Sequence, residues 1–287
     1  MPEAARSDDE HECHHVEGNR PHRGGPIEYI TRGTVMTGRL PQARAGDRCR
    51  CDGPPSLIVT GSSSVYVDGK QAARKGDLTM HPPPGEVKRG CGSVYIGGRR
   101  AGATLGGGVL SRRTCEKATA TRASRSSMQS GGNCGVESVR QIINLARATP
   151  ITEDALLRDA FEHGEATPDP DPKHNGGATA EENVRTLARH GIPARAQEMD
   201  FPQIVHAVAE GRGVITTHET SILWGSDQQG KHAVLVAGVD FDDRGRMVAV
   251  LINDTGWGEC VKRLPPEVFE RSLSPGQQTV VTDQPIW

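Results

Sequence analysis

An internal repeat near the start of the chain constrains its fold more than any other feature. The sequence Ser-Val-Tyr at 64–66 returns at 93–95, and Thr-Val-Met at 34–36 stands at the matching point about thirty residues earlier. Each copy is typical of a short strand, a glycine turn and a second short strand. A strand pair of this length cannot bury its own apolar face. Three copies therefore predict a small all-β body with pseudo-threefold symmetry.

Cysteine and histidine occupy matching points of these copies. A Gly-Asp pair is followed by Cys51 in the first copy and by His81 in the second, and Cys91 precedes the third strand. Equivalent points of a symmetric body converge at one end, and Zn²⁺ prefers thiolate and imidazole ligands. We therefore expect these three residues to bind zinc, completed by Cys49 or by an N-terminal histidine. The alternative is that they are isolated small residues in tight turns.

The residues ahead of the repeat are polar and acidic. We expect 1–29 to form a flexible segment, and we interpret the cluster His11–His15 as part of a solvated tail rather than as a metal site. The N-terminus lacks the apolar run of a classical signal peptide. The chain has no apolar run long enough to span a bilayer, so the sequence predicts no membrane anchor.

The repeat resembles the PAAR-repeat proteins that cap the spike of type VI secretion systems. The resemblance covers 30–103 and rests on Gly61–Gly69, Ala72–Asp77 and Gly92–Gly98. It implies a zinc-bound cone that sits on a VgrG-type spike trimer and carries a toxin behind it. Where the family has His-Gly-Gly after the first Gly-Asp, this sequence has Cys51-Asp-Gly.

A linker separates the repeat from the rest of the chain. Residues 104–127 begin with glycines and continue with serine, threonine and arginine, a composition that cannot build a core. We expect a flexible, basic tether, followed by a second domain at 128–287. The net charge of the whole chain is −2, which excludes a nucleic-acid binder on bulk electrostatics.

Cys134 organises the second domain. Asn133 is a residue type that caps helices, and an apolar pattern at helical spacing follows it. In the first turn of a helix, free N–H groups and the helix dipole favour the thiolate, which is the nucleophilic form. Gln129 stands five residues earlier, where its amide and the Cys134 N–H would make an oxyanion hole. The alternative is a small core residue at a helix start.

The chain also offers a base and an orienting group for this thiol. His232 opens a buried strand, and Asn253 and Asp254 end the strand that follows the turn at 241–246. Hairpin strands bring such residues side by side, which supplies the partners that a nucleophilic cysteine needs. His218 is the rival base, because it also lies at a strand end.

The order of these residues resembles the papain-like cysteine peptidases, and most closely the bacteriocin-processing type. That type has Gln-x4-Asp/Asn-Cys-Gly, then His before an apolar run and Gly, then Asn-Asp at a strand end. The resemblance covers 128–287 and implies an α+β fold, as do helices that precede an antiparallel sheet. It also implies that Cys134 is the nucleophile and that His232 is the general base and acid. Asp254 would orient the histidine, with Asn253 as the alternative, and Gln129 would donate to the oxyanion. Thr255 stands where the family usually has proline.

Together the two resemblances imply a type VI secretion effector. The expected activity is cleavage of a protein in a competing bacterium, by a cysteine protease that needs no cofactor for catalysis. We expect action in the target cytoplasm, with the periplasm as the alternative, and a cognate immunity protein in the producer. Free thiols or metal ligands are expected over disulfides. The rival functions are a glutamine deamidase, acyl transferase or peptidoglycan amidase with the same triad, or a non-enzymatic spike-tip adaptor.

Overall fold

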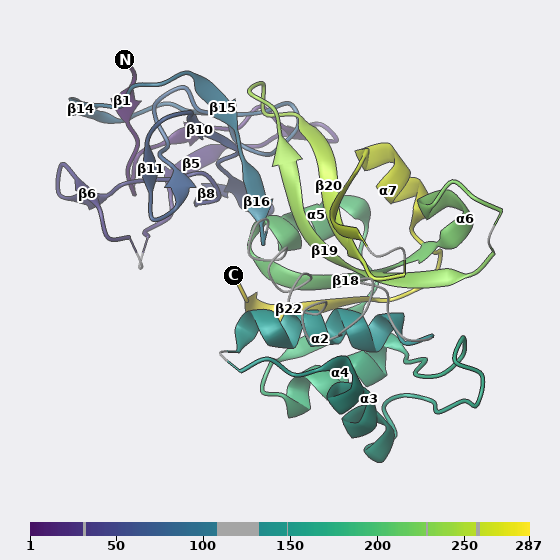
Figure 1. Ribbon diagram of the computed structural model, residues 1–287. Coiled ribbons are helices and arrows are strands. Elements are labelled where there is room, and N and C mark those ends of the chain that lie inside the picture. Colours follow the sequence, from purple (N-terminus) through teal and green to yellow (C-terminus); the bar gives the residue numbers. More distant parts are fainter. Residues whose placement is uncertain (31–32, 108–131, 148, 228, 257–258) are drawn as a thin grey trace. The chain divides into compact units, whose positions relative to one another are not determined.

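The protein consists of two compact units (Figure 1). The computed structural model describes residues 1–287 except 31–32, 108–131, 148, 228 and 257–258. The first unit comprises Met1–Leu105 and Asp240–Val248, and the second comprises Gly106–Val239 and Ala249–Trp287. The predicted two-domain organisation is confirmed, whereas the predicted linker lies outside the described residues except for 104–107. None of the described helices is long and apolar enough to cross a membrane.

The first unit is built almost entirely of short antiparallel strands. The strands are β1 (Glu3–Ala4), β2 (His11–Glu12), β3 (Val16–Glu17), β4 (Arg20–Pro21), β5 (Gly24–Ile27), β6 (Met36–Thr37), β7 (Leu40–Pro41), β8 (Arg48–Cys51), β9 (Ser56–Leu57), β10 (Thr60–Ser62), β11 (Tyr66–Val67), β12 (Lys70–Gln71), β13 (Glu86–Val87), β14 (Cys91–Tyr95), β15 (Arg100–Gly102) and β16 (Thr104–Gly106). The hairpins β6–β7 and β11–β12 belong to the first two copies of the repeat.

The N-terminus completes the third copy. Met36 pairs with Pro41 and Tyr66 pairs with Gln71, each within one hairpin. In the third copy the corresponding residue, Tyr95, pairs with Glu3 at the start of the chain. The expectation of a flexible segment at 1–29 is therefore wrong, because β1–β5 lie in it. The partner strands of β1, β2 and β5 are distant in sequence, where no local pattern reveals them.

Three alanines, one in each copy, are joined in a ring of backbone hydrogen bonds. The backbone N–H of Ala5 donates to the carbonyl of Ala73, Ala73 donates to Ala43, and Ala43 donates to Ala5, at 3.0, 2.8 and 2.9 Å. All three side chains are fully buried. The residue that follows each alanine is an arginine that pairs with an aspartate three positions on, as in Arg74–Asp77 at 3.0 Å. Equivalent backbone hydrogen bonds and ion pairs in the three copies thus give the predicted pseudo-threefold symmetry.

The second unit is an α+β domain, as the sequence predicts. Its elements are α2 (Cys134–Ala146), α3 (Glu153–Glu162), α4 (Ala180–Arg189), β17 (Ala194–Gln197), α5 (Phe201–Ala209), β18 (Arg212–Glu219), α6 (Thr220–Leu223), β19 (Lys231–Phe241), β20 (Met247–Asp254), β21 (Glu259–Leu264), α7 (Pro266–Ser272) and β22 (Thr279–Pro285). The strand order in the sheet is β17-β22-β18-β19-β20-β21.

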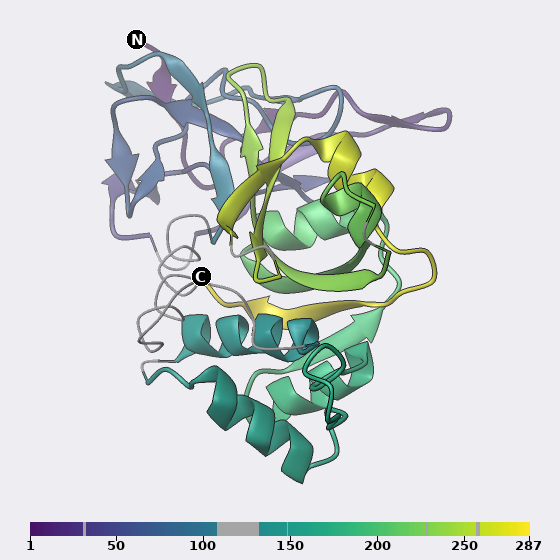
Figure 2. The same cartoon turned by 45° about the vertical axis from the view of Figure 1, so that its right-hand side comes forward.

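Helix α2 is anchored between the other helices and the sheet. Figure 2 shows α2, α3 and α4 together on one side of β22, and α5 on the opposite side of the sheet. The apolar face of α2 carries Val136, Val139 and Ile142, which are buried against α3, α4 and the sheet. Each contributes about 1.5–3 kcal/mol by its burial. This packing fixes the N-terminus of α2, where Cys134 lies, beside the start of β19.

Candidate catalytic and metal sites

The nucleophile candidate lies at the first position of α2. Asn133 occupies the N-cap position, but its side chain makes no capping hydrogen bond and instead donates to Glu153 Oε1 at 2.9 Å. The backbone N–H of Ala233 donates to Cys134 Sγ at 3.3 Å. Burial alone would raise the pKa of the Cys134 thiol. His232 and the N–H groups of Ala233 and Gly135 outweigh this effect and hold the pKa below its ordinary value.

His232 is held between the sulfur and a carboxylate. Its Nε2 lies 2.9 Å from Asp254 Oδ1, and both side chains are buried. Because Asp254 occupies Nε2, the other ring nitrogen, Nδ1, is the one left for Cys134. Burial lowers the pKa of His232, but hydrogen bonds and charge from Asp254 and Cys134 raise it to about 9. The two opposite pKa shifts favour a thiolate beside an imidazolium.

The structure places Asp254 rather than Asn253 against the histidine. Asn253 points elsewhere: its Nδ2 donates to Gln141 Oε1 at 2.8 Å, and its Oδ1 accepts the Val261 N–H at 2.9 Å. Successive residues of a strand face opposite sides, so only one of the two can reach His232. The second oxygen of Asp254 accepts from Trp224 Nε1 at 2.8 Å. Trp224 also lies against the histidine, with the ring centroids 5.3 Å apart.

The sequence also predicted an oxyanion donor, Gln129, and a rival base, His218. Gln129, the expected oxyanion donor, lies outside the described residues. His218, the rival base, is opposite His232 in the β18–β19 pair. Its ring nitrogens lie 2.8 Å from Thr216 Oγ1 and 2.7 Å from Ser272 Oγ. Burial lowers the pKa of His218 to about 3, so this ring is a neutral structural residue.

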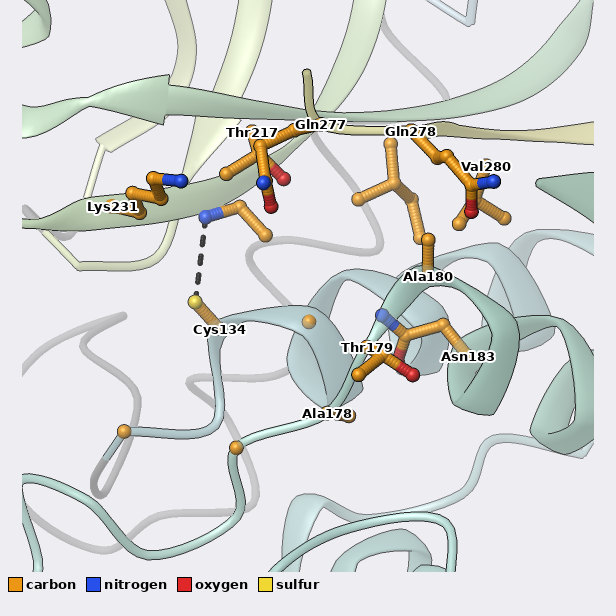
Figure 3. A pocket seen from close by; sticks show the side chains of 15 residues that line it. Cys134, Ala178, Thr179, Ala180, Asn183, Thr217, Lys231, Gln277, Gln278 and Val280 are labelled. Atoms are coloured by element: carbon orange, nitrogen blue, oxygen red, sulfur yellow. Dashed lines mark hydrogen bonds between the residues drawn. The ribbon is translucent and has the colours of Figure 1, made fainter. Parts of the chain in front are cut away.

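A cavity of 220 Å³ opens beside Cys134 (Figure 3). Its walls come from the first turn of α2, the segment before α4, strands β18 and β19, and the segment that leads into β22. Most of the residues near the helices have no side chain beyond a methyl group. They are Gly132, Gly135, Gly177, Ala178 and Ala180. The wall next to the sulfur therefore consists largely of backbone.

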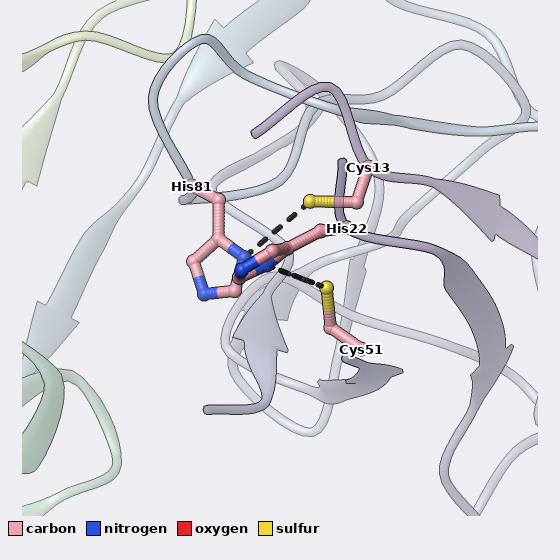
Figure 4. Close-up of side chains that lie close together, drawn as sticks. All are labelled: Cys13, His22, Cys51 and His81. Carbon is pink, nitrogen blue, oxygen red and sulfur yellow. Dashed lines mark hydrogen bonds between the residues drawn. The ribbon is translucent and has the colours of Figure 1, made fainter. Parts of the chain in front are cut away.

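A second cluster of chemically active side chains lies in the first unit. Ligand atoms of Cys13, His22, Cys51 and His81 all lie within 4.8 Å of one another (Figure 4). The distances from sulfur to Nδ1 are 3.5 Å for Cys13–His81, 3.5 Å for Cys51–His22 and 3.6 Å for Cys51–His81. Tetrahedral zinc with ordinary Zn–S and Zn–N bonds separates sulfur from nitrogen by about 3.6 Å. The cluster can therefore hold a metal ion of this kind without rearrangement.

The repeat explains three members of the cluster. Cys13, Cys51 and His81 each stand four residues after the aspartate of an arginine–aspartate pair, and His22 follows β4. Cys13 is absent from the ligand set expected from the sequence, whereas His22 stands where Cys49 or an N-terminal histidine was expected. The spacing Ala-Arg-x-x-Asp-x3-Cys at 5–13 is the signal that identifies Cys13.

The other two expected ligands, Cys49 and Cys91, lie elsewhere. Cys49 is fully buried in the apolar core with Ile27 and Ile58. Its sulfur is not among the ligand atoms that lie within 4.8 Å of one another in the cluster. Cys91 Sγ lies 3.3 Å from Ser93 Oγ in β14. The expectation of free thiols also fails at one position, because Cys260 is disulfide-bonded.

Comparison with known proteins finds a family match within the first unit. Residues 17–82 match the family model of the PAAR motif, which confirms the resemblance inferred from the repeat. The chain is similar to a solved structure of a C39-like peptidase from Bacillus anthracis, with 12% sequence identity. The match covers 53% of this chain and 88% of that chain and has a TM-score of 0.40. It is also similar to a double glycine motif protease from an AMS/PCAT transporter in complex with the leader peptide, with 16% sequence identity. That match covers 54% of this chain and 88% of that chain and has a TM-score of 0.37. No curated protein matches the chain.

Proposed function

We propose that the protein is a type VI secretion effector whose second unit is a cysteine peptidase that cleaves a protein of a target bacterium. The observation that carries this proposal is the buried chain of contacts from Cys134 through His232 to Asp254. A sulfur with a lowered pKa beside an imidazole with a raised pKa is the charge state that a cysteine nucleophile requires.

The reaction follows from these contacts. The Cys134 thiolate attacks the carbonyl carbon of the scissile peptide, and the carbonyl oxygen becomes an oxyanion near the Cys134 N–H. The His232 imidazolium gives its proton to the leaving amine as the C–N bond breaks, and the acyl group stays on sulfur. A water then loses a proton to His232, attacks the thioester and restores the thiolate. Asp254 keeps the ring oriented and stabilises its charge. Gln129 remains the proposed second oxyanion donor.

The cavity supports a preference for small substrate residues. Pockets that bind small molecules commonly measure about 300–1,000 Å³, whereas this cavity measures 220 Å³. A substrate side chain that points toward Gly135 or Ala178 meets backbone rather than open space. We therefore propose glycine, alanine or serine at the residues next to the scissile bond.

The first unit supports delivery on a spike tip. Met36, Tyr66 and Tyr95 stand at equivalent points of the three copies and are 56%, 58% and 53% exposed. Three equivalent apolar side chains suit a partner with threefold symmetry, such as a VgrG-type trimer. The Cys₂His₂ cluster would hold zinc and stabilise a domain with a small core.

The state of Cys260 supports the periplasm as the compartment of action. Disulfides persist in oxidising compartments and are rare in the bacterial cytoplasm. The disulfide at Cys260 therefore favours the periplasm over the cytoplasm as the site of action. The periplasm also contains the amide bonds of peptidoglycan, so a peptidoglycan amidase with the same triad is the second candidate. An immunity protein in the producer would then act in the periplasm.

A competition experiment tests the proposal. A producer that delivers the full-length protein is mixed with a sensitive strain, and the survival of that strain is counted. The wild type and the matched control Cys91→Ser should kill, whereas Cys134→Ala should not. Equal killing by Cys134→Ala would refute the enzyme and favour an adaptor. The wild type, expressed with or without a periplasmic signal in the sensitive strain, separates the compartments.

A further inference from the structure

We propose that Asn183 binds the peptide backbone of the substrate next to the scissile bond. This role rests on the proposed function, because it requires that Cys134 acts on a peptide. Asn183 was not among the residues that the sequence singled out.

Asn183 lies against the helix turn that carries the nucleophile. A Cβ atom built on Gly135 would stand 2.8 Å from Asn183 Nδ2 and 3.3 Å from its Oδ1, so the carboxamide rests on the backbone one residue after Cys134. Asn183 is 4% exposed and lines the cavity of Figure 3 together with Cys134. Only glycine at position 135 leaves space for it.

Within the described part of the chain, the oxygen of this carboxamide is left without a role in the fold. Asn183 Oδ1 is buried and has no hydrogen-bond partner among the described residues. The backbone N–H of Asn183 continues α4 by donating to Thr179, which any residue would do. Buried polar side chains are nearly always paired, and asparagine is a weak helix former. A polar group kept in such a place indicates a partner that arrives with the substrate.

The surroundings favour a peptide backbone as that partner. Ala178 and Ala180 offer no polar side-chain atom, and Thr179 Oγ1 already accepts the Glu182 N–H at 3.2 Å. Figure 3 shows Thr217, Lys231 and Gln277 on the opposite wall of the cavity from Asn183. A carboxamide offers one acceptor oxygen and two N–H donors, which match the N–H and carbonyl of one peptide unit. An extended chain between the walls would meet this group.

Two alkylating probes test the inference on the full-length protein. Iodoacetamide reports the thiolate alone, and acetyl-Ala-Ala chloromethyl ketone needs the cavity as well. Labelling is followed on the Cys134 peptide by mass spectrometry. Asn183→Leu keeps the shape but removes the hydrogen bonds. It should lower the rate with the chloromethyl ketone about tenfold, the effect of one neutral hydrogen bond, and leave the iodoacetamide rate within twofold. Asn183→Ala serves as a second variant if Asn183→Leu does not fold.

The backbone contact is tested with chloromethyl ketones that are N-methylated at one amide or the other. One of the two methyl groups should slow wild type about tenfold more than it slows Asn183→Leu, since the variant has no contact to lose. Equal losses in both proteins, or unchanged chloromethyl ketone rates in the variant, would overturn the inference and leave the catalytic proposal standing. A wild-type Cys134 that iodoacetamide labels no faster than Cys91 would refute both.

Discussion

Gly256 offers the sharpest perturbation of the proposed active site. A Cβ atom at this position would lie 2.7 Å from His232 Cε1, 3.0 Å from His232 Nε2 and 3.2 Å from Trp224 Cζ2. Carbon atoms pack at about 3.5–4.0 Å, so Gly256→Ala requires roughly 1 Å of movement by the imidazole or by the end of β20. The ring cannot turn away freely, because Asp254 holds its Nε2.

The expected consequence is a loss of catalysis with little loss of folding. A misplacement of about 1 Å in a catalytic group can cost on the order of 100-fold in rate. We expect Gly256→Ala to lower kcat/KM for a small-residue peptide by about that factor. The rate of iodoacetamide labelling at Cys134 should fall too, because the imidazolium that stabilises the thiolate has moved.

Gly92→Ala is the matched control. A Cβ atom at Gly92 has no atom within 4 Å, so this variant should behave as wild type. Thermal unfolding of both variants shows whether they fold. A folded Gly256→Ala protein whose kcat/KM lies within twofold of wild type would refute the assignment of His232 as the catalytic base.

Three further predictions concern the metal, the pH dependence and the third triad member. Atomic absorption should find about one zinc per chain in wild type and in Cys91→Ser, whereas Cys13→Ser should lose the zinc. A chelator should lower the thermal unfolding temperature of wild type but not that of Cys13→Ser. Activity should rise with pH through the lowered pKa of the thiol and fall as His232 loses its proton near pH 9. Asp254→Asn should lower kcat, by up to about 10⁴-fold as for the aspartate of a Ser-His-Asp triad, and move the upper limb of the pH profile to lower pH. Asn253→Ser should mainly lower the unfolding temperature, so a kcat loss equal to that of Asp254→Asn would contradict the geometry.

Local sequence signals predicted much of the second unit. The spacing Thr179-x2-Glu182 is the local sequence signal of a capping box, and both of its hydrogen bonds are present. The hairpin that joins β19 to β20 predicted that His232 and the end of β20 would meet. Both depend on residues that are neighbours in sequence or across one turn, where the backbone leaves few alternatives.

Long-range pairing limited the rest. Strand β1 pairs with β14, about ninety residues further along the chain, so the N-terminal segment appears unstructured when read alone. The pairing of β2 with β13, also distant in sequence, holds the strand that Cys13 follows. For Asn253 and Asp254, alternation along a strand guarantees that one faces His232, but only the three-dimensional register says which. Asn183 gives no sequence signal, because its significance lies in a hydrogen bond that the fold leaves unmade.

The most direct test of the central claim is a comparison of protein N-termini in target cells. Sensitive bacteria receive wild type or Cys134→Ala, and new N-termini are labelled and identified by mass spectrometry. Hydrolysis by the proposed triad predicts new termini that follow small residues in wild-type samples only. Identical termini in both samples, from cells that wild type alone kills, would contradict proteolysis.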